Sequence, residues 1–339
     1  MIKNIIILGS TGSIGTSTLS IIKRDKNFRI KLLSAKKNIK KLLIQAIEFK
    51  VKNVIIEDKI AYENYLNIFK KKKINLFLGL KNIKKIVKKK VNYCVNSISG
   101  IDGLHPTLEI IPYTKNILIA NKESIICGWH LINKKLKFHK TNFIPIDSEH
   151  FSIWKLIKNE NKGDLDKIIL TASGGPFLNS SIKKISNIDP NIAIKHPNWK
   201  MGKKISIDSS NIMNKVFEFI EAKKIFNLPN EKLSIIIHPS SYIHAIVFFK
   251  GNLVKFLAHD TDMKIPISNA LDANLNFKNN SEFDIIKKFR KIKLYLPNKK
   301  KFPLLKIISL IPKNDSYFET ILITLNDSLV EKYILRQIN

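Results

Sequence analysis

The first half of the chain alternates short β-branched segments with longer segments of helical spacing, and this alternation limits the folds that the chain can adopt. Strand-like segments lie at residues 4–8, 29–34, 53–56, 92–97, 117–120 and 142–146. Helical segments lie between several of them, at residues 16–23, 39–49 and 60–71. Strands that alternate with helices of this length are typical of a parallel sheet covered by helices. The sequence therefore predicts an α/β protein with an N-terminal doubly wound, Rossmann-like sheet.

The pattern changes in the second half of the chain. Strand-like segments lie at residues 167–171, 233–238, 243–249 and 253–258, with longer stretches between some of them. From about residue 303 the chain has two helical stretches. We therefore expect a second domain of the α+β class after the parallel sheet, followed by a helical C-terminal segment.

The chain is strongly basic, with 59 Lys and Arg residues against 27 Asp and Glu residues and a net charge of +32. Such a charge attracts polyanions without specificity. The lysines are spread along the whole chain, and the lysine-rich segments at 70–73, 81–90 and 299–301 lack the interleaved aromatic residues that base stacking uses. We therefore expect no specific nucleic-acid partner.

The sequence also argues against membrane insertion and against an oxidising compartment. Apolar residues make up 44% of the chain, yet none of its apolar runs reaches the length of a membrane-spanning helix. The opening apolar run at residues 5–8 leads straight into glycines and is too short for a signal peptide. Cys94 and Cys127 form neither a C-x-x-C pair nor a zinc pattern with histidines. We therefore expect a cytoplasmic protein with no membrane partner.

A glycine-rich loop, GSTGSIG at residues 9–15, directly follows the first strand-like segment and precedes a helical one. Glycines allow a tight turn and let the backbone approach a pyrophosphate, which then lies at the helix N-terminus. The spacing is G-x-x-G-x-x-G instead of G-x-G-x-x-G, so a plain glycine turn is an alternative. After the second strand, where an NAD site has an acid, the chain has Lys36, Lys37 and Asn38. The missing acid and the two cations favour the 2′-phosphate of NADP(H), although lysines are frequent throughout this chain.

Two carboxylates, Asp147 and Glu149, follow the apolar segment at residues 142–146. In an extended segment alternate side chains point to the same side, so we expect both carboxylates on one face. Paired hard oxygen ligands suit Mg²⁺ or Mn²⁺. An acidic turn after a strand is the alternative reading of an isolated D-x-E.

Residues 208–218, DSSNIMNKVFE, fit a helix. Asn214 lies four residues before Glu218 and Lys215 lies three before it, so in a helix all three share one face. We expect Asn214 and Lys215 to hold a substrate and Glu218 to complete the metal site. The alternative is an exposed ion pair on a helix that has Ser209 near its N-cap.

Another polar motif, ANKES at residues 120–124, also follows a predicted strand. Lys122 can hold an anionic or carbonyl oxygen, and Asn121 and Glu123 can orient a cofactor by hydrogen bonds. A helix start with Asn121 as the N-cap explains the same residues equally well.

Two loops further along carry groups suited to a phosphate site and a lid. In SGGPF at residues 173–177, the Ser173 hydroxyl and the glycine N–H groups can bind a phosphate, although a turn before Pro176 also fits. HPNW at residues 196–199 carries an indole in a loop, which we interpret as a lid that excludes water. A buried, anchoring Trp199 is the alternative.

In this order, the motifs GSTGSIG, ANKES, PIDSEH, SGGPF, HPNW and MNK-x-x-E resemble the 1-deoxy-D-xylulose 5-phosphate reductoisomerase family. The resemblance extends from residue 1 to about residue 335. It implies conversion of 1-deoxy-D-xylulose 5-phosphate to 2-C-methyl-D-erythritol 4-phosphate in non-mevalonate isoprenoid precursor biosynthesis. It also implies NADPH and Mn²⁺ or Mg²⁺ as cofactors, with Co²⁺ as a further candidate, and a homodimer.

The resemblance further implies roles for individual residues. The NADPH site would be formed by Thr11, Gly12, Ser13, Ile14, Lys36, Lys37, Asn38, Asn121, Glu123 and Gly202. The divalent metal would be bound by Asp147, Glu149 and Glu218. The phosphorylated sugar would be bound by Lys122, Ser148, Glu149, Ser173, His196, Ser209, Asn214, Lys215 and Glu218. The catalytic residues would be Lys122, Asp147, Glu149, His196 and Glu218. His196 and Trp199 would belong to a closing loop.

By this resemblance we expect three domains. They are an NADPH-binding domain over residues 1–146, a catalytic domain that binds metal and substrate over 147–272, and a linker with a truncated C-terminal helical domain over 273–339. The chain has Lys36 and Ala172 where family members often have Gly, so we expect slightly rearranged cofactor and phosphate contacts. It stops at Asn339, within what resembles the family's C-terminal domain. We expect activity to survive and an apolar face of that domain to lean on a partner subunit.

Two other functions remain open on the sequence alone. The first is a metal-assisted, NADP-dependent dehydrogenase of another phosphorylated sugar, which would give an unbranched product. The second is a basic binding protein derived from the enzyme, against which the intact Asp147, Glu149 and Glu218 argue.

Overall fold

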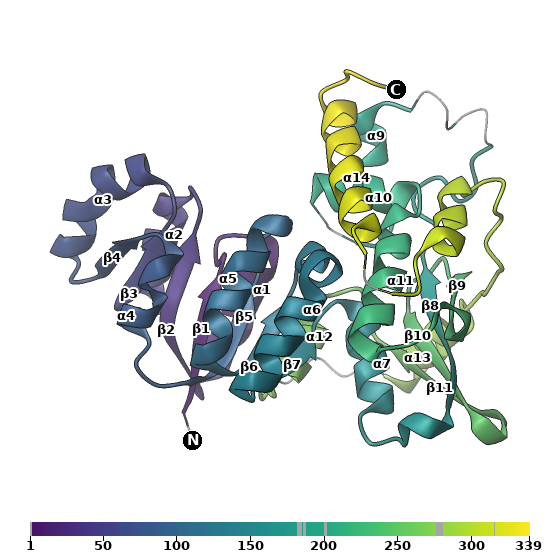
Figure 1. Cartoon of the computed structure of the whole chain (residues 1–339), viewed down its shortest axis with the longest axis horizontal. Helices are drawn as coiled ribbons and strands as arrows, with labels where there is room; N and C mark the ends of the chain where they lie inside the picture. The colour runs from purple at the N-terminus through teal and green to yellow at the C-terminus, as the bar shows by residue number, and fades with distance from the viewer. Residues whose placement is uncertain (1, 182–184, 186–187, 200–201, 276–280, 315) are drawn as a thin grey trace. The chain divides into compact units, whose positions relative to one another are not determined.

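The computed structural model of the chain divides into two compact units (Figure 1). The first comprises Met1–Asp147 with Met263–Asn276, and the second comprises Ser148–Asp262 with Phe277–Asn339. The structure describes residues 2–181, 185, 188–199, 202–275, 281–314 and 316–339. Among them, no helix is both long enough and apolar enough to cross a bilayer.

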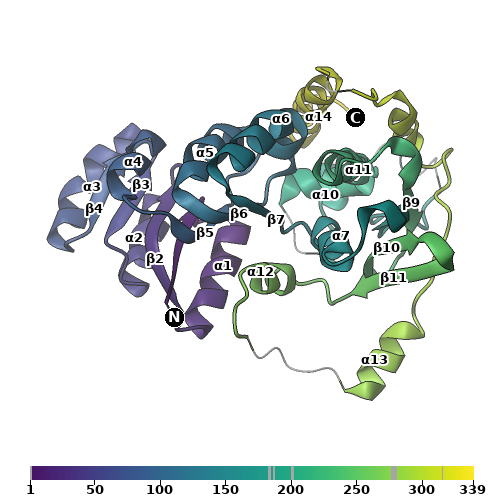
Figure 2. The ribbon, with the colours of Figure 1, turned by 60° about the horizontal axis from the view of Figure 1, so that its bottom comes forward.

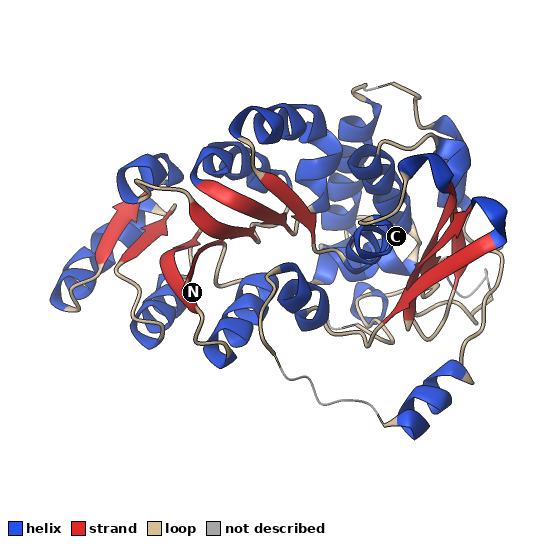
Figure 3. Cartoon of the chain, turned by 90° about the horizontal axis from the view of Figure 1, so that it is seen from below, coloured by secondary structure: helices blue, strands red, loops and turns tan. Residues whose placement is uncertain are grey.

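The first unit is built on a seven-stranded parallel sheet with the strand order β4-β3-β2-β1-β5-β6-β7. Its strands are β1 Lys3–Leu8, β2 Phe28–Ala35, β3 Asn53–Ile56, β4 Asn75–Leu78, β5 Val91–Asn96, β6 Thr114–Ile119 and β7 Asn142–Pro145. Its helices are α1 Ser13–Arg24, α2 Ile39–Glu48, α3 Lys59–Lys71, α4 Ile83–Ile86, α5 Leu104–Ile110, α6 Lys122–His139 and α12 Lys264–Ala270. Helices cover both faces of this sheet, with α1 and α12 on one side and α5 and α6 on the other (Figures 2 and 3). The prediction of a doubly wound, Rossmann-like sheet is therefore confirmed.

The strand order reverses at the centre of this sheet, between β1 and β5. In open parallel sheets, ligands bind at the carboxyl ends of the strands beside such a reversal. The central strand β1 is apolar without alternation, and Ile5, Ile6, Ile7 and Leu8 are completely buried, as expected for a strand covered on both faces. The sheet thus holds the glycine loop that follows β1 in a fixed position at the reversal point.

The second unit contains a four-stranded sheet with the order β11-β10-β8-β9. Its strands are β8 Leu165–Ala172, β9 Leu233–Ile237, β10 Ile243–Phe249 and β11 Leu253–Ala258, and only the β8–β9 pair is parallel. Its helices are α7 Ser148–Ile157, α9 Pro190–Ala193, α10 Lys203–Ser210, α11 Met213–Phe226, α13 Glu282–Phe289 and α14 Phe318–Ile334 (Figure 1). Helix α7 packs on β10 and β11, and α11 packs on β8 and β9. The unit therefore has the α+β character that the sequence predicts.

The C-terminal part of the chain packs against elements that carry predicted substrate-binding residues. The two expected helical stretches are a 3₁₀ helix, Pro303–Leu310, and α14. Helix α14 packs on α10, and Val330 joins Phe177, Ala193 and Ile207 in one buried apolar cluster. Because α10 carries Ser209 and Phe177 ends the SGGPF loop, α14 stabilises the elements around the predicted phosphate site.

Candidate active site

The glycine loop between β1 and α1 is shaped by close backbone contacts within the first unit. Gly9 has φ +74°, and a Cβ atom at this position would lie 2.9 Å from the backbone of Ser97. A Cβ atom at Gly15 would lie 2.6 Å from the carbonyl oxygen of Gly9. Gly12 is the N-cap of α1 and provides no side-chain cap, so N–H groups of the first turn point outward for an anion. The loop therefore has the features of a pyrophosphate site, whereas a plain turn would not need glycine at both ends.

The end of β2 lies beside this loop, since Ser10 N–H donates to Ser34 O at 2.8 Å. Lys36 Nζ contacts Asp102 Oδ2 at 2.7 Å on the surface. Asn38 is the N-cap of α2 and accepts a hydrogen bond from Lys41 N at 3.2 Å. The predicted contacts of these residues and of the exposed Lys37 with the adenosine end of NADPH stay predictions.

In ANKES, Asn121 occupies the N-cap position of α6 without capping it through its side chain. Its amide donates instead to Ile98 O at 2.7 Å and to Gly100 O at 3.0 Å. Glu123 is buried, and Lys122 Nζ lies 3.1 Å from Asp147 Oδ2 within the first unit. The alternative of a helix start with Asn121 at the N-cap is therefore confirmed, although the Asn121 side chain bonds to Ile98 and Gly100 instead of capping α6.

The acidic motif lies at a turn from strand to helix, so our premise of an extended segment is wrong. Strand β7 ends at Pro145 and α7 begins at Ser148. Glu149 lies in the first turn of α7, where its carboxylate accepts a hydrogen bond from Ser148 Oγ at 2.6 Å. Negative charge at a helix N-terminus is favoured by the helix dipole. Asp147 joins the two units and precedes Glu149 by two residues, which keeps their Cα atoms within roughly 7 Å.

Within the second unit, a buried cluster of charged side chains joins α7 to α11. Lys215 Nζ donates to Glu149 Oε1 at 2.6 Å and also to Glu218 Oε2. Asn214 Nδ2 donates to Glu218 Oε1 at 2.5 Å. One carboxylate oxygen of Glu149 lies within 4.8 Å of one of Glu218. The predicted shared helix face is thus observed, and the alternative of an exposed ion pair is wrong because the side chains of Lys215 and Glu218 are only 7% and 2% exposed.

The electrostatics of this cluster favour a cation between the acids. Burial alone would lower the pKa of Lys215, but the nearby carboxylates of Glu149 and Glu218 raise it above its ordinary value. Lys215 is therefore charged at neutral pH. Buried carboxylates that face each other need positive charge, which an ammonium group supplies here and a divalent cation supplies more strongly.

Residues 208–218 do not form one helix. Helix α10 ends at Ser210, and α11 begins at Met213 after a break at Asn211 and Ile212. Ile212 is 2% exposed and has φ +69°, a left-handed conformation that is strained for a β-branched residue. Ser209 therefore lies on α10 and is not near the N-cap of α11, which corrects that alternative.

The SGGPF loop lies directly against Ser209. Gly174 and Gly175 have φ values of +80° and +68°, and a Cβ atom at Gly175 would lie 2.7 Å from Ser209 O. The Ser173 hydroxyl accepts a hydrogen bond from Gly175 N at 3.1 Å. Gly175 thus contacts both the Ser209 backbone and the Ser173 hydroxyl, a proximity that neither sequence segment indicates by itself.

His196 is held as a neutral donor beside Ser173. Its Nδ1 accepts hydrogen bonds from the backbone N–H groups of Asn198 at 3.1 Å and Trp199 at 3.0 Å. We infer that Nε2 carries the proton, and it contacts Ser173 Oγ at 3.0 Å. Burial, followed by the charge of Lys215, lowers the pKa of His196 to about 4. Ser173 Oγ thus accepts from two donors, and its own O–H is left to bind a ligand oxygen.

Comparison with known proteins identifies the family of this chain. Residues 5–128 match the model described as 1-deoxy-D-xylulose 5-phosphate reductoisomerase, and residues 143–226 match the model of that protein's C-terminal domain. A 1-deoxy-D-xylulose 5-phosphate reductoisomerase of Pelagibacter ubique is 52% identical over 99% of this chain and 87% of that protein. The chain belongs to this reductoisomerase family. The homologue of Wolbachia pipientis wMel is 41% identical over 96% of this chain and 83% of its own length.

Solved reductoisomerase structures have the same fold. A crystal structure of DOX-P reductoisomerase in complex with NADPH, fosmidomycin and magnesium superposes with a TM-score of 0.90 at 33% identity. It covers 99% of this chain and 86% of that one. The Zymomonas mobilis reductoisomerase in complex with NADPH superposes with a TM-score of 0.89 at 30% identity and covers 100% of this chain and 88% of that one.

The HPNW loop at residues 196–199, which we predict to be a lid, lies among the described residues. Trp199 is half-buried, and its ring meets that of His244 edge-on at 6.0 Å. Lys200 and Met201 lie outside the described residues. Gly202 is the N-cap of α10, and nothing lies within 4 Å of a Cβ atom built on it. Whether Trp199 closes over a substrate therefore stays a prediction, as does the contact of Gly202 with NADPH.

The structure also shows buried groups near the acids that our sequence analysis missed. His150 Nε2 donates to Glu218 O at 2.9 Å, and its Nδ1 lies 3.6 Å from Glu221 Oε2. All three residues are almost completely buried. The sequence places both residues next to the predicted acids, because His150 follows Glu149 directly and Glu221 lies three residues after Glu218 on one helix. His150 thereby fixes α11 against α7, which positions Glu218.

Proposed function

We propose that this chain is an NADPH- and divalent-metal-dependent oxidoreductase that rearranges and reduces 1-deoxy-D-xylulose 5-phosphate to 2-C-methyl-D-erythritol 4-phosphate. The observation that carries the proposal is the buried contact of Glu149 and Glu218 with Lys215, which brings together two acids that are far apart in the sequence. Membership of the reductoisomerase family supports it. The reaction places the chain in isoprenoid precursor biosynthesis.

Glu149, Glu218 and Asp147 are the residues that would hold the divalent cation. The donor set fits, because hard carboxylate oxygens are the ligands that Mg²⁺ and Mn²⁺ prefer, and Co²⁺ is a further candidate. Glu149 and Glu218 already share a cation, the Lys215 ammonium. Asp147 lies two residues before Glu149, so the backbone keeps the two residues close together. A bound cation would polarise adjacent oxygens of the hydroxyketone and stabilise the negative charge that develops during the rearrangement.

The first unit would bind NADPH along the carboxyl ends of its central strands. The fit rests on the glycine loop, where added Cβ atoms at Gly9 or Gly15 would collide with backbone, and on the α1 N-terminus. The proposed contacts are Thr11, Gly12, Ser13, Ile14, Lys36, Lys37, Asn38, Asn121, Glu123 and Gly202. NADPH would supply the hydride that reduces the rearranged aldehyde.

The substrate phosphate would bind at the surface shared by Ser173 and Ser209. Ser173 offers its O–H, since its oxygen already accepts from His196 and Gly175. Asn214 and Lys215 extend from α11 next to the acids, so they would bind substrate oxygens, and Ser148 would add a hydroxyl. Lys122, held at 3.1 Å from Asp147, would bind a substrate oxygen from the first unit. Contacts with the remote phosphate supply binding energy that orients the reacting carbons and closes the lid.

The decisive experiment measures NADPH oxidation by the purified chain with 1-deoxy-D-xylulose 5-phosphate, with and without Mn²⁺, and identifies the product. We expect metal-dependent oxidation and a branched product. Glu218→Gln should lose this activity while it stays folded, and Glu231→Gln, at an exposed position of the same unit, should keep it. An unbranched product would instead identify a dehydrogenase of another phosphorylated sugar. Full activity of Glu218→Gln would refute the proposed metal site.

We also propose that the chain works as a cytoplasmic homodimer and is divided functionally at residues 1–146, 147–272 and 273–339. Support for the dimer comes from edge strand β11, which exposes Leu253, Val254 and Phe256 by 52%, 45% and 45%. Exposed apolar edge strands tend to be covered by a partner. Light scattering should give the mass of a dimer, and Phe256→Lys should shift it toward a monomer.

A further inference from the structure

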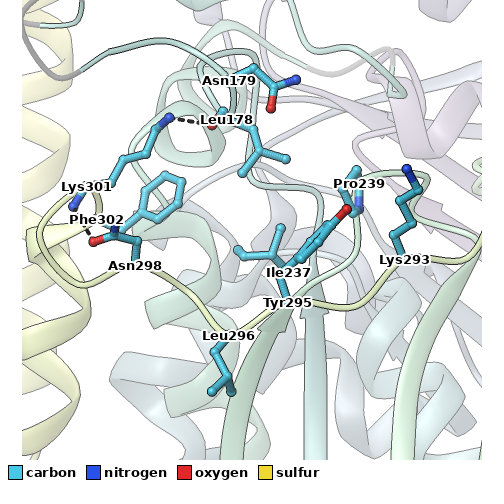
Figure 4. Close-up of a pocket in the computed structure, with 10 residues that line it drawn as sticks. All are labelled: Leu178, Asn179, Ile237, Pro239, Lys293, Tyr295, Leu296, Asn298, Lys301 and Phe302. Carbon is cyan, nitrogen blue, oxygen red and sulfur yellow. Dashed lines mark hydrogen bonds between the residues drawn. The ribbon is translucent and has the colours of Figure 1, made fainter.

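A cavity in the second unit shares no residue with the proposed active site. Its volume is about 610 Å³, which falls in the range of small-molecule sites. It lies where the segment before the 3₁₀ helix runs alongside β9 (Figure 4). Ile237 and Tyr295 exchange backbone hydrogen bonds of 2.8 and 2.9 Å, which fix this segment to the end of the strand. The end of β9 and the segment around Tyr295 therefore form adjoining walls of the cavity.

The side chains around the cavity suit an anion with an apolar body. Ile237 and Phe302 are buried apolar side chains at 2% and 3% exposure, and Tyr295 adds a half-exposed ring that leans toward Pro239 in Figure 4. Lys293 and Lys301 also line the cavity, and none of its ten lining residues, all in the described part of the chain, is acidic. Lysine ammonium groups beside an apolar surface attract a phosphate or carboxylate whose carbon chain covers that surface.

The same walls touch both loops of the proposed substrate site. Leu178 directly follows SGGPF, and Lys301 Nζ donates to Leu178 O and, at 2.7 Å, to Ser180 O. On the other side, Pro239 O accepts from the Asn198 amide of HPNW at 2.7 Å. A molecule that presses on Leu178 or Pro239 therefore acts on the loops that carry Ser173 and His196.

We propose that this cavity binds a small amphiphilic anion, with a phosphate or carboxylate held by Lys293 and an apolar chain over Ile237 and Phe302, and that its occupancy shifts the HPNW loop. Binding of the anion does not depend on the proposed function, whereas an effect of the anion on substrate binding rests on that function. Such an anion would regulate the enzyme from this cavity without occupying the proposed metal site.

Titration calorimetry on the full chain tests binding with octyl phosphate, octanoate and octanol. We expect saturable binding of at least one anion, at least about tenfold tighter than octanol, and the preferred anion identifies the head group. Lys293→Gln should weaken that binding roughly fivefold, while Lys299→Gln, an exposed lysine of the same segment outside the cavity, should leave it unchanged. Ser209→Ala should also leave it unchanged, because Ser209 belongs to the substrate phosphate site. Equal binding of octanol, equal effects of the two lysine variants, loss in Ser209→Ala or no saturable binding would each overturn the proposal.

Fluorescence of Trp199 tests the coupling without any activity measurement. The preferred anion should change the emission of the wild type, and the change should disappear in Trp199→Phe and need a higher anion concentration in Lys293→Gln. Binding without such a change would refute the coupling. If the reductoisomerase assay fails while these titrations succeed, the proposed function is wrong and the cavity assignment stands.

Discussion

Replacing Lys215 by Met should destabilise the chain in a way that a divalent cation repairs. The substitution keeps the length and the apolar stem of the side chain but removes the ammonium that contacts Glu149 at 2.6 Å and also contacts Glu218. The two carboxylates then lose the ammonium that they share, and Glu218 is only 2% exposed. Removing one partner from a buried ion pair costs about 3–5 kcal/mol. In domains of 150–250 residues, each kcal/mol of lost stability lowers Tm by roughly 2–4 °C, so we expect Tm to fall by about 6–20 °C.

The assay is a thermal melt in EDTA and in a Mn²⁺ series, with Lys203→Met as a matched control at an exposed position of the same unit. In EDTA, Lys215→Met should melt well below the wild type, and Lys203→Met should melt close to it. Saturating Mn²⁺ should raise the Tm of Lys215→Met by more than that of the wild type, because the metal takes over the charge that the ammonium supplied. Equal Tm values in EDTA, or an equal rise with Mn²⁺, would refute the idea that the ammonium and the metal compensate the same acids.

Two further predictions concern the cofactor loop and the phosphate site. Gly15→Ala should abolish tight NADPH binding and lower the free energy of unfolding by about 1–3 kcal/mol, because the added Cβ would lie 2.6 Å from Gly9 O. Gly163→Ala is the control, since the nearest atom to its added Cβ is 3.4 Å away. It should leave both NADPH binding and the free energy of unfolding nearly unchanged. The lowered pKa of His196 means that the unfolded chain takes up a proton near pH 6.5 before the folded chain does near pH 4. The contribution of His196 to stability is therefore complete above pH 6.5 and is lost as the pH falls toward 4. His196→Gln should therefore show a smaller loss of Tm between pH 6.5 and 4 than the wild type. Parallel plots of Tm against pH for the two proteins would contradict the lowered pKa of His196.

The fold could be predicted where local pattern and burial agree. The uninterrupted apolar run at residues 5–8 favours a buried strand, and β1 occupies the centre of the sheet. Strand β4 was missed because Asn75–Leu78 is a four-residue edge strand bordered by lysines on its N-terminal side. It exists through its pairing with β3, and no local signal in the sequence reports that pairing.

The residue types of the candidate site could be read from the sequence, but their geometry could not. The residue types of a cation site were visible in Asp147, Glu149 and Glu218, yet the reason given for the first two was wrong, since Glu149 lies in a helix. Contact between Lys215 and Glu149 spans 66 residues. It depends on α7 and α11 packing together through His150, so a single sequence carries no direct signal for it.

The break at Ile212 shows why helical spacing alone was insufficient. In an uninterrupted helix, Ser209 and Asn214 would be five residues apart and therefore about 140° apart around the axis, so both could not face one substrate. The left-handed turn at Ile212 redirects the chain between them. Such a conformation costs about 1–3 kcal/mol, and burial of the Ile212 side chain, 2% exposed, offsets about 1.5–3 kcal/mol. An apolar side chain at this position therefore stabilises a turn that glycine would adopt without strain, and the turn would let α10 and α11 contribute to the one proposed substrate site.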